Sequence, residues 1–321
     1  MVEASGSCRM HVSGQIFEEP IMSAPQKPKR RHHHVWQNYL RPWTVGGALY
    51  CLQDGRIFSA GTQTVAVQKD FYKLHRLKAQ DLALLKLIFG QGRSYAVRAH
   101  ADLLNRLMLP FRFAEQFEDG LHRDQIEADL DDYASNVLED YHARIEASFI
   151  PALESALSGD IGFYADDKQC ISFLNYLCTQ YLRTRGVKER VLEKSPFPEP
   201  IWNIAIHMFA TNVGATLYVE RKRRTLTIVN NRTDVPFITG DQPAINLKGT
   251  RPDPTDSFSI FYPIAPHAGL LLAEVDEEPM FPADGLTRDQ ASSLNRMIFR
   301  ASYKQVFARS AECLKAVAEA V

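Results

Sequence analysis

The longest regular pattern of apolar positions lies in residues 124–157. Apolar side chains recur there at steps of three and four residues, at Ile126, Leu130, Tyr133, Val137, Leu138, Tyr141 and Ile145. This period places them on one face of an α-helix, so the pattern predicts a single long helix with one buried stripe. Pro151 should bend or interrupt this helix, because proline cannot donate a backbone hydrogen bond.

Shorter segments have the same helical period. They lie at residues 82–88, at 99–107 with an end before Pro110, at 167–185, and in a segment that begins at Ile201. Asp167 is a suitable N-cap for the third of them, and Gly186 stands where that helix would end. Two more helices are predicted near the C-terminus, one at residues 287–300 and one after residue 308.

Short apolar segments between turn residues predict strands at both ends of the chain. Near the N-terminus, Asp54-Gly55 separates residues 49–52 from residues 56–58, and this dipeptide is the strongest short-range signal of a β-hairpin. In the last third, strands are expected at residues 216–220, 226–229, 237–239, 259–262, 270–272 and 305–307. A basic hairpin turn at residues 221–224 would join the first two of these.

The order strands, helices, strands predicts an α+β protein. Its mostly antiparallel sheet would be built from N- and C-terminal segments and packed on a central helical region, because neither β-rich piece is large enough to stand alone. We expect a disordered basic tail at residues 1–30 and a single domain at 31–321. Within that domain the expected parts are an N-terminal β piece at 31–73, a helical middle at 74–212 and a β-rich part at 213–321.

Composition narrows the class of protein without indicating a reaction. The 321 residues are 45% hydrophobic and 23% charged, with 37 basic against 38 acidic side chains, as in an ordinary globular chain. The sequence has neither an apolar run of about 18 residues nor the pattern of a secretory signal. Its five cysteines are scattered and form no C-x-x-C pair, which favours reduced thiols. We therefore expect a cytoplasmic protein without membrane contact.

Candidate chemistry depends on three polar clusters, because the sequence contains no glycine-rich phosphate loop, G-x-S-x-G elbow, H-E-x-x-H or paired cysteine site. The first cluster is His32-His33-His34, whose imidazoles could bind a metal ion, move a proton or contact a phosphate. In an extended segment His32 and His34 share one side and His33 faces the other, so at most two can enter one site. The structural interpretation is that one histidine packs at the start of the fold while the others are solvated.

The second cluster is Thr239-Gly240-Asp241-Gln242-Pro243, directly after an apolar strand. A carboxylate at the end of a strand is typical of an active-site acid. It is equally typical of an aspartate that accepts backbone N–H groups in a turn.

The third cluster combines Gln180 and Arg183 with Glu146 on the preceding long helix. Gln180 and Arg183 are three residues apart and share a helical face. Arg183 could hold an anion or pair with Glu146, and we favour the buried structural pair because anion sites are few.

Two basic segments could contact a nucleic-acid backbone. They contain Lys29, Arg30 and Arg31 at the end of the tail, and Arg221, Arg223 and Arg224 in the predicted turn. Binding through such clusters would depend strongly on salt concentration. Solvated surface is the alternative for both segments.

Four ordered segments of the chain carry recurrent polar residues. They are His33-His34-Val35-Trp36-Gln37-Asn38-Tyr39-Leu40, Asp70-Phe71-Tyr72, Gln180-Tyr181-Leu182-Arg183-Thr184 and Phe237-Ile238-Thr239-Gly240-Asp241-Gln242-Pro243. Together they resemble a bacterial family named domain of unknown function 4238, over about residues 31–308. The family opens approximately H-Y-V-P-Q-F-Y-L, which places its histidine on His33, and this chain departs at His34 and Trp36. The later family pattern is roughly F-I-T-S-D-N-P, so Asp241 and Pro243 match while Gly240 and Gln242 depart.

The resemblance implies no established reaction. It does select positions in which polar residue types dominate: His33, Asp70, Tyr72, Gln180, Arg183 and Asp241. A purely structural family would more readily recur in apolar types.

Two classes of function fit these residues. In the first, the chain is a metal-dependent phosphodiesterase or nuclease-like enzyme of a bacterial toxin or phage-defence type. Its catalytic residues would be His33, Gln180, Arg183 and Asp241, and its ligands for Mg²⁺ or Mn²⁺ would be His33, Glu146 and Asp241.

In the second class, the chain is a noncatalytic binding or sensor module that recognises a protein or a nucleic acid. The same polar residues would then form a buried network that joins the N-terminal piece to the Asp241 strand. Convergence of His33, Arg183 and Asp241 around an open cleft would favour the enzyme. Pairing of these residues under apolar cover would favour the module.

Overall fold

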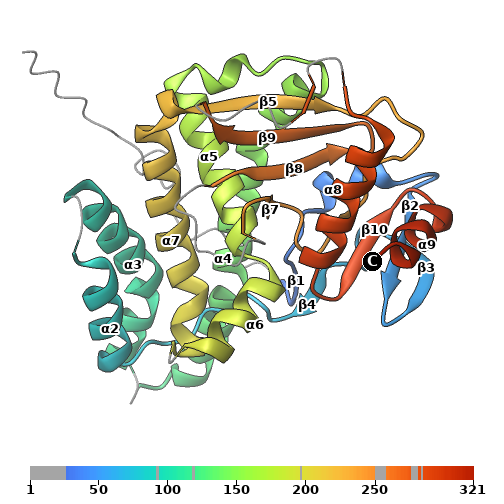
Figure 1. Cartoon of the computed structure of the whole chain (residues 1–321). Helices are drawn as coiled ribbons and strands as arrows, with labels where there is room; N and C mark the ends of the chain where they lie inside the picture. Colours follow the sequence, from blue (N-terminus) through green and yellow to red (C-terminus); the bar gives the residue numbers. More distant parts are fainter. Residues whose placement is uncertain are drawn as a thin grey trace, which may run out of the picture.

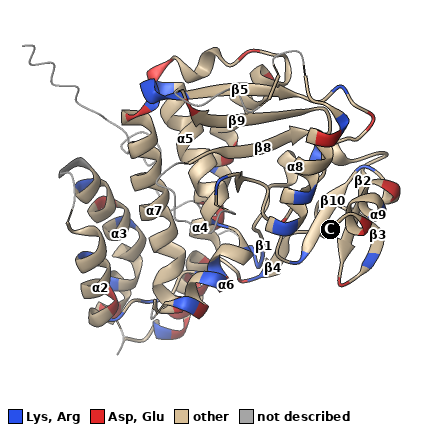
Figure 2. Ribbon diagram, viewed as in Figure 1, with Lys and Arg blue, Asp and Glu red and all other residues tan. Residues whose placement is uncertain are grey.

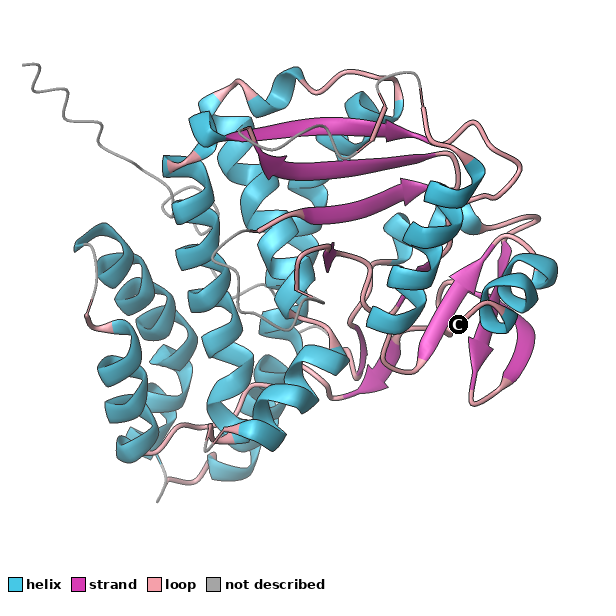
Figure 3. Cartoon of the chain, in the orientation of Figure 1, coloured by secondary structure: helices cyan, strands magenta, loops and turns pink. Residues whose placement is uncertain are grey.

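The described residues form an α+β fold, as the order of predicted elements indicated. The computed structural model describes residues 27–91, 94–117, 120–195, 197–249, 258–275, 281–282 and 285–321. Helices fill one side and the centre of the molecule, while strands lie across the top and at the opposite side (Figure 1 and Figure 3). Within these residues no helix is both long enough and apolar enough to cross a membrane.

One four-stranded sheet joins the two ends of the chain. Strands β2 (Ala48–Gln53) and β3 (Arg56–Gly61) form the predicted hairpin, and Asp54 and Gly55 have the positive φ values, 50° and 74°, that a tight two-residue turn requires. Strand β10 (Gln305–Ala308) pairs with β2, and β6 (Thr239–Gly240) pairs with β10, both antiparallel. The prediction that N- and C-terminal segments share a sheet is therefore confirmed.

A second four-stranded sheet comes entirely from the C-terminal third. Its antiparallel order is β5 (Arg224–Asn230), β9 (Ala268–Glu274), β8 (Ile260–Ala265) and β7 (Ile245–Asn246). Every residue of β8 is buried, because apolar clusters cover both faces. Tyr262 stacks on Tyr39 on one face, and Phe261 contacts Phe237 on the other.

A third, two-stranded sheet positions the histidine segment. Strand β1 (Arg31–His33) pairs antiparallel with β4 (Val67–Lys69), so His33 lies opposite Val67. Beyond the strands, the N–H of Asp70 donates to the carbonyl of Arg30 at 2.8 Å, which continues the pairing by one residue.

The helices form the remaining layer. Their bounds are α1 (Gln37–Leu40), α2 (Ala79–Phe89), α3 (Ser94–Ala114), α4 (Arg123–Leu157), α5 (Asp167–Leu182), α6 (Arg185–Lys194), α7 (Glu199–Val219), α8 (Arg288–Ala301) and α9 (Ala311–Glu319). Short 3₁₀ turns lie at η2 (Arg41–Trp43), η3 (Glu115–Phe117), η4 (Gly162–Tyr164) and η5 (Arg221–Arg223). Helices α4, α5 and α7 run through the centre, while α2 and α3 lie beside them on the side away from the β2–β3 hairpin (Figure 1).

Helix α4 confirms the long helix predicted from its apolar stripe, and Pro151 lies inside it without ending it. Helix α3 was predicted to end before Pro110 but continues to Ala114. The residues after this proline hold the last turn in place, because Phe111 and Ala114 are both buried in the apolar cluster formed with α4 and α7.

The end predicted for the helix at residues 167–185 was wrong. Helix α5 ends at Leu182, its N-cap is Asp166, whose side chain accepts the N–H of Gln169, and Gly186 lies inside α6. A Cβ atom on Gly186 would come within 2.9 Å of the Cβ of Tyr303, so this glycine permits close packing and does not stop a helix.

The predicted strand at residues 216–220 was also wrong, because α7 continues to Val219. Leu217 is a good helix former, and burial of Leu217 and Tyr218 in the core between α7 and the second sheet overrides the strand preference of Tyr218. Residues 221–223 consequently form η5 and lead into β5 instead of forming a hairpin tip. The expected boundary between the helical middle (74–212) and the β-rich part (213–321) therefore falls within α7.

Candidate functional site

The histidine segment alternates as an extended chain should. His32 and His34 are buried, whereas His33 is partly exposed on the opposite side. The Nδ1 of His32 accepts the N–H of Tyr72 at 2.7 Å, and its Nε2 lies 2.5 Å from the carbonyl oxygen of Lys29 and 3.0 Å from that of Ser135. Since two carbonyls can only accept, the proton of this neutral ring is on Nε2.

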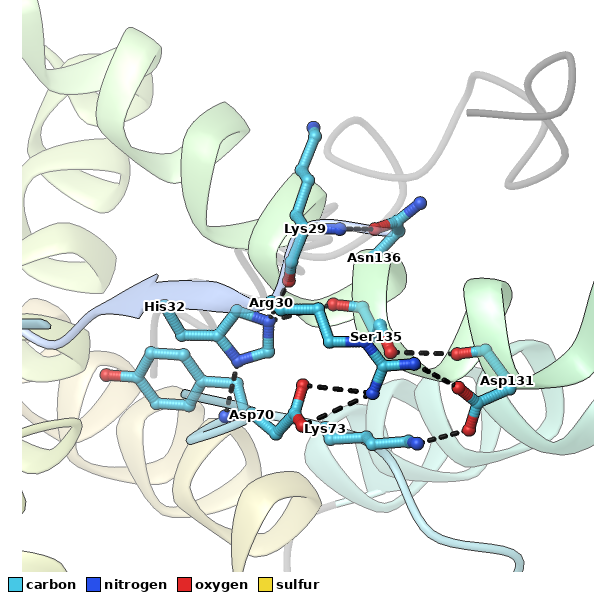
Figure 4. Close-up of polar contacts among 9 residues, drawn as sticks. Lys29, Arg30, His32, Asp70, Lys73, Asp131, Ser135 and Asn136 are labelled. Carbon is cyan, nitrogen blue, oxygen red and sulfur yellow. Dashed lines mark hydrogen bonds and ion pairs between the residues drawn. The ribbon is translucent and has the colours of Figure 1, made fainter. Parts of the chain in front are cut away.

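The last residues before β1 contact helix α4. Arg30 lies between two carboxylates, donating to Asp131 at 2.5 Å and to Asp70 at 3.2 Å, and Lys73 pairs with the other oxygen of Asp131 (Figure 4). The backbone N–H of Lys29 donates to Asn136 at 2.6 Å, and its ammonium group pairs with Asp140. Residues 1–26 of the predicted disordered tail lie outside the described residues, but its last residues are packed.

Arg183 is the centre of the buried polar cluster. Its side chain is 2% exposed, and each of its three nitrogens has a partner: Nε donates to the hydroxyl of Tyr72 at 3.0 Å, Nη1 to Glu146 at 3.3 Å, and Nη2 to the carbonyl oxygen of His33. The hydroxyl of Tyr72 in turn donates to the carbonyl of Arg183 at 2.8 Å. The predicted pair of Arg183 with Glu146 is confirmed.

The carboxyl groups of α4 at this cluster have shifted pKa values. Burial raises the pKa of Glu146 to about 8, although the guanidinium of Arg183 opposes the shift. Burial also raises the pKa of Glu139, which accepts the backbone N–H of His33. The side chain of Glu146 is 23% exposed, so solvent can reach its carboxyl group.

Gln180 and His33 both lie at the end of β1, but their side chains have different partners. Gln180 is buried, and its Nε2 donates to the carbonyl of His34 at 3.3 Å. The ring of His33 lies 3.3 Å from the carbonyl of Gln63 through Nε2, and burial lowers its pKa. The cluster therefore holds the backbone of the histidine segment, whereas the ring of His33 is directed to a neighbouring loop.

Asp241 belongs to a different network. It is 1% exposed, and its two carboxylate oxygens accept the backbone N–H groups of Tyr303 at 2.7 Å, Lys304 at 2.8 Å and Gln305 at 3.1 Å. Burial raises the pKa of Asp241, while these three amides oppose the shift. Its own N–H donates to the carbonyl of Gln305 at 2.9 Å, so Asp241 connects β6 with the start of β10.

The structure thus brings together Glu146, Gln180, Arg183 and the backbone of His33, whose ring is directed to Gln63, and leaves Asp241 apart. In the part of the chain that the structure describes, Asp241 contacts neither Arg183 nor Glu146. No three His, Cys, Asp or Glu side chains of the described residues are grouped to hold a metal ion. The ligands predicted for Mg²⁺ or Mn²⁺ are therefore not gathered in one place.

Two buried histidines of the interior were missed from the sequence. His142 on α4 and His207 on α7 have ring centroids 4.9 Å apart, and none of their four ring nitrogens has a hydrogen-bond partner among the described residues. Burial lowers the pKa of His207 to about 3 and that of His142 well below its usual value. The spacing of Glu139, His142 and Glu146 places all three on one face of α4 and was the signal available in the sequence.

The predicted basic turn does not form a continuous cationic surface. Arg221 pairs with Asp167 and stacks on Tyr218, and Arg224 is largely buried between Glu220 and Glu274. Arg223 is exposed. Positions of Lys and Arg alternate with positions of Asp and Glu along the helices (Figure 2).

Comparison with protein families shows to which family the chain belongs. A family model described as "Protein of unknown function (DUF4238)" matches residues 31–312. The chain belongs to the DUF4238 family. All four segments that carry the resemblance in this DUF4238 protein lie within the matched residues. Comparisons with curated proteins and with solved structures found no match.

Proposed function

We propose that this DUF4238 protein is a noncatalytic binding or sensor module that recognises a protein or a nucleic acid. One observation carries the proposal: the guanidinium of Arg183 and the carboxylate of Asp241 are buried, and their polar atoms bind other parts of the same chain. A group that acts on a substrate must come within hydrogen-bond distance of it. Neither of these groups can do so without giving up its internal partners.

The positions of these residues explain why polar types recur in the family segments. Arg183 joins α4 and α5 to the backbone of β1, and Asp241 joins β6 to β10. Both connections link segments that are far apart in the chain. A satisfied buried network of this kind specifies one arrangement of the core and is costly to leave incomplete.

The substitution Asp241→Asn tests the role of the carboxylate. The amide nitrogen of asparagine cannot accept an N–H, so at least one amide of residues 303–305 should lose its partner. We expect the free energy of unfolding to fall by about 1–3 kcal/mol. Asp129→Asn, a matched change at an exposed position of α4, should leave the stability unchanged within about 0.5 kcal/mol.

Incubation with labelled DNA and RNA in Mg²⁺, Mn²⁺ or EDTA tests the absence of catalysis. The proposal expects no cleavage by the purified protein under any of these conditions. Metal-dependent cleavage that Asp241→Asn abolishes, with little change in melting temperature, would contradict it.

A nuclease-like enzyme is the second candidate, and Glu146 is the observation that favours it. Its partly exposed carboxyl, with a pKa raised to about 8, could exchange a proton near neutral pH beside Arg183 and the His33 segment. In this case Glu146→Gln should abolish cleavage of labelled RNA or DNA. Glu154→Gln, at another position of α4 outside the cluster, should retain it.

A further inference from the structure

A cavity of about 500 Å³ lies between the β2–β3–β10 sheet and helices α8 and α9. Its floor is an apolar row across three strands, because Val306 pairs with Leu52 and Leu52 pairs with Ile57, which places all three side chains on one face. Phe299 at the end of α8 adds to this floor. A volume of this size is typical of sites for small ligands.

The lining carries four charged side chains of both signs. Lys304 lies at the same end of the sheet as Asp54, since their neighbours Gln305 and Gln53 are paired, and Lys315 and Glu319 share one face of α9. None of the four forms an ion pair within the residues described. Each side of the cavity therefore carries one cation and one anion, and Lys304 and Lys315 also interact electrostatically with Glu189 and Glu312, respectively.

The wall that contains Tyr303 is fixed from two directions. Its backbone N–H donates to Asp241 at 2.7 Å, and its hydroxyl donates to Glu189 of α6. The neighbouring amide of Lys304 also donates to Asp241 at 2.8 Å. Asp241 thus holds the polypeptide at the edge of the cavity, and a site whose walls are fixed in advance binds with a smaller loss of entropy.

We propose that this cavity binds a short apolar peptide with a free amino group and a free carboxylate. The apolar floor would contact the side chains, the lysines would bind the carboxylate, and Asp54 and Glu319 would bind the ammonium group. A ligand with a single charge would leave two like charges of the lining facing it. This inference rests on the proposed binding function and names its ligand.

Isothermal titration calorimetry with trileucine tests the assignment. The wild-type protein should bind trileucine with a Kd of about 1 mM or tighter. Amidation of the carboxylate or acetylation of the amine should each weaken binding roughly tenfold, as expected for loss of one charge-assisted hydrogen bond.

Substitutions at two exposed positions test which charged group of the peptide each lining residue binds. In Lys315→Gln the preference for the free acid over the amide should shrink, and in Glu319→Gln the preference for the free amine over the acetylated amine should shrink, because Lys304 and Asp54 each keep one contact. Lys222→Gln, which lies outside the cavity in η5, should keep both preferences. Because these side chains are on the surface, all three variants should fold normally.

Absence of saturable binding by trileucine overturns the inference. Binding that neither amidation of the carboxylate nor acetylation of the amine weakens also overturns it. Tighter binding of a diacidic peptide than of trileucine, lost in Lys315→Gln, would identify an anion site instead. Any of these results leaves the proposed noncatalytic function standing, because the cleavage assay and Asp241→Asn decide that separately.

Discussion

Three neutral, buried histidines should each lower the stability of this protein in mild acid. Burial lowers the pKa of His34 and of His207 to about 3, and that of His142 well below its usual value. The guanidinium of Arg183 adds to all three shifts. A proton added to any of these rings would place a second buried positive charge near the guanidinium of Arg183.

The size of the effect follows from the difference in bound protons. Each ring has a pKa of 6.5 when unfolded and a much lower value when folded, so its contribution to stability is lost as the pH falls below 6.5. Between pH 7 and pH 5 His34 and His207 should each cost about 2 kcal/mol of stability, and His142 should add to this loss.

Glu146 acts in the opposite direction. Its pKa rises from 4.5 to about 8 on folding, so the folded protein keeps a proton that the unfolded chain releases, and acidification from pH 7 to pH 5 should stabilise it by about 2.5 kcal/mol. The raised pKa values of Glu139 and Asp241 act in the same direction. The lowered pKa of His33 acts with the other histidines. These carboxyl groups therefore offset part of the loss of stability that the buried histidines cause in acid.

Urea unfolding at pH 7, 6 and 5 measures this dependence. His207→Gln removes one of the titrating rings, so its loss of stability over the same range should be smaller than that of the wild type by about 2 kcal/mol. Thr179→Val is the control: it changes a buried polar side chain that does not titrate, and it should keep the wild-type dependence on pH whatever its own stability. Equal pH dependence in His207→Gln and wild type would refute the reasoning.

Three other substitutions probe the contacts that build the fold. Arg183→Gln removes the guanidinium hydrogen bonds to the hydroxyl of Tyr72 and to the carbonyl of His33 and should lower the free energy of unfolding by about 3 kcal/mol, measured in urea at pH 7.5. Gly55→Ala places a side chain at φ 74° and should cost about 1 kcal/mol in the same assay. Asp131→Asn removes the shared partner of Arg30 and Lys73, so limited trypsin digestion should cut the segment before β1 faster than in the wild type. An unchanged cutting rate would show that these ion pairs do not hold the segment.

Locally encoded features were predictable because neighbouring residues determine them. The Asp54-Gly55 turn needs only two positive φ values, and the α4 stripe needs only the helical period, so both were correct. The end of α7 was not predicted, because the last turn of this helix is held by burial of Leu217 and Tyr218 against distant elements. In the candidate site, the pair of Arg183 with Glu146 followed from their places on adjacent helices.

The sequence by itself determined the class of the fold, the hairpin, the long helix and the alternation of His32, His33 and His34. Only the tertiary structure decided which polar groups meet. Asp241 binds amides 62 to 64 residues further along the chain, while Arg183 binds the histidine strand 150 residues before it. Such partners depend on how strands and helices pack in space, and no local pattern of residues records that geometry.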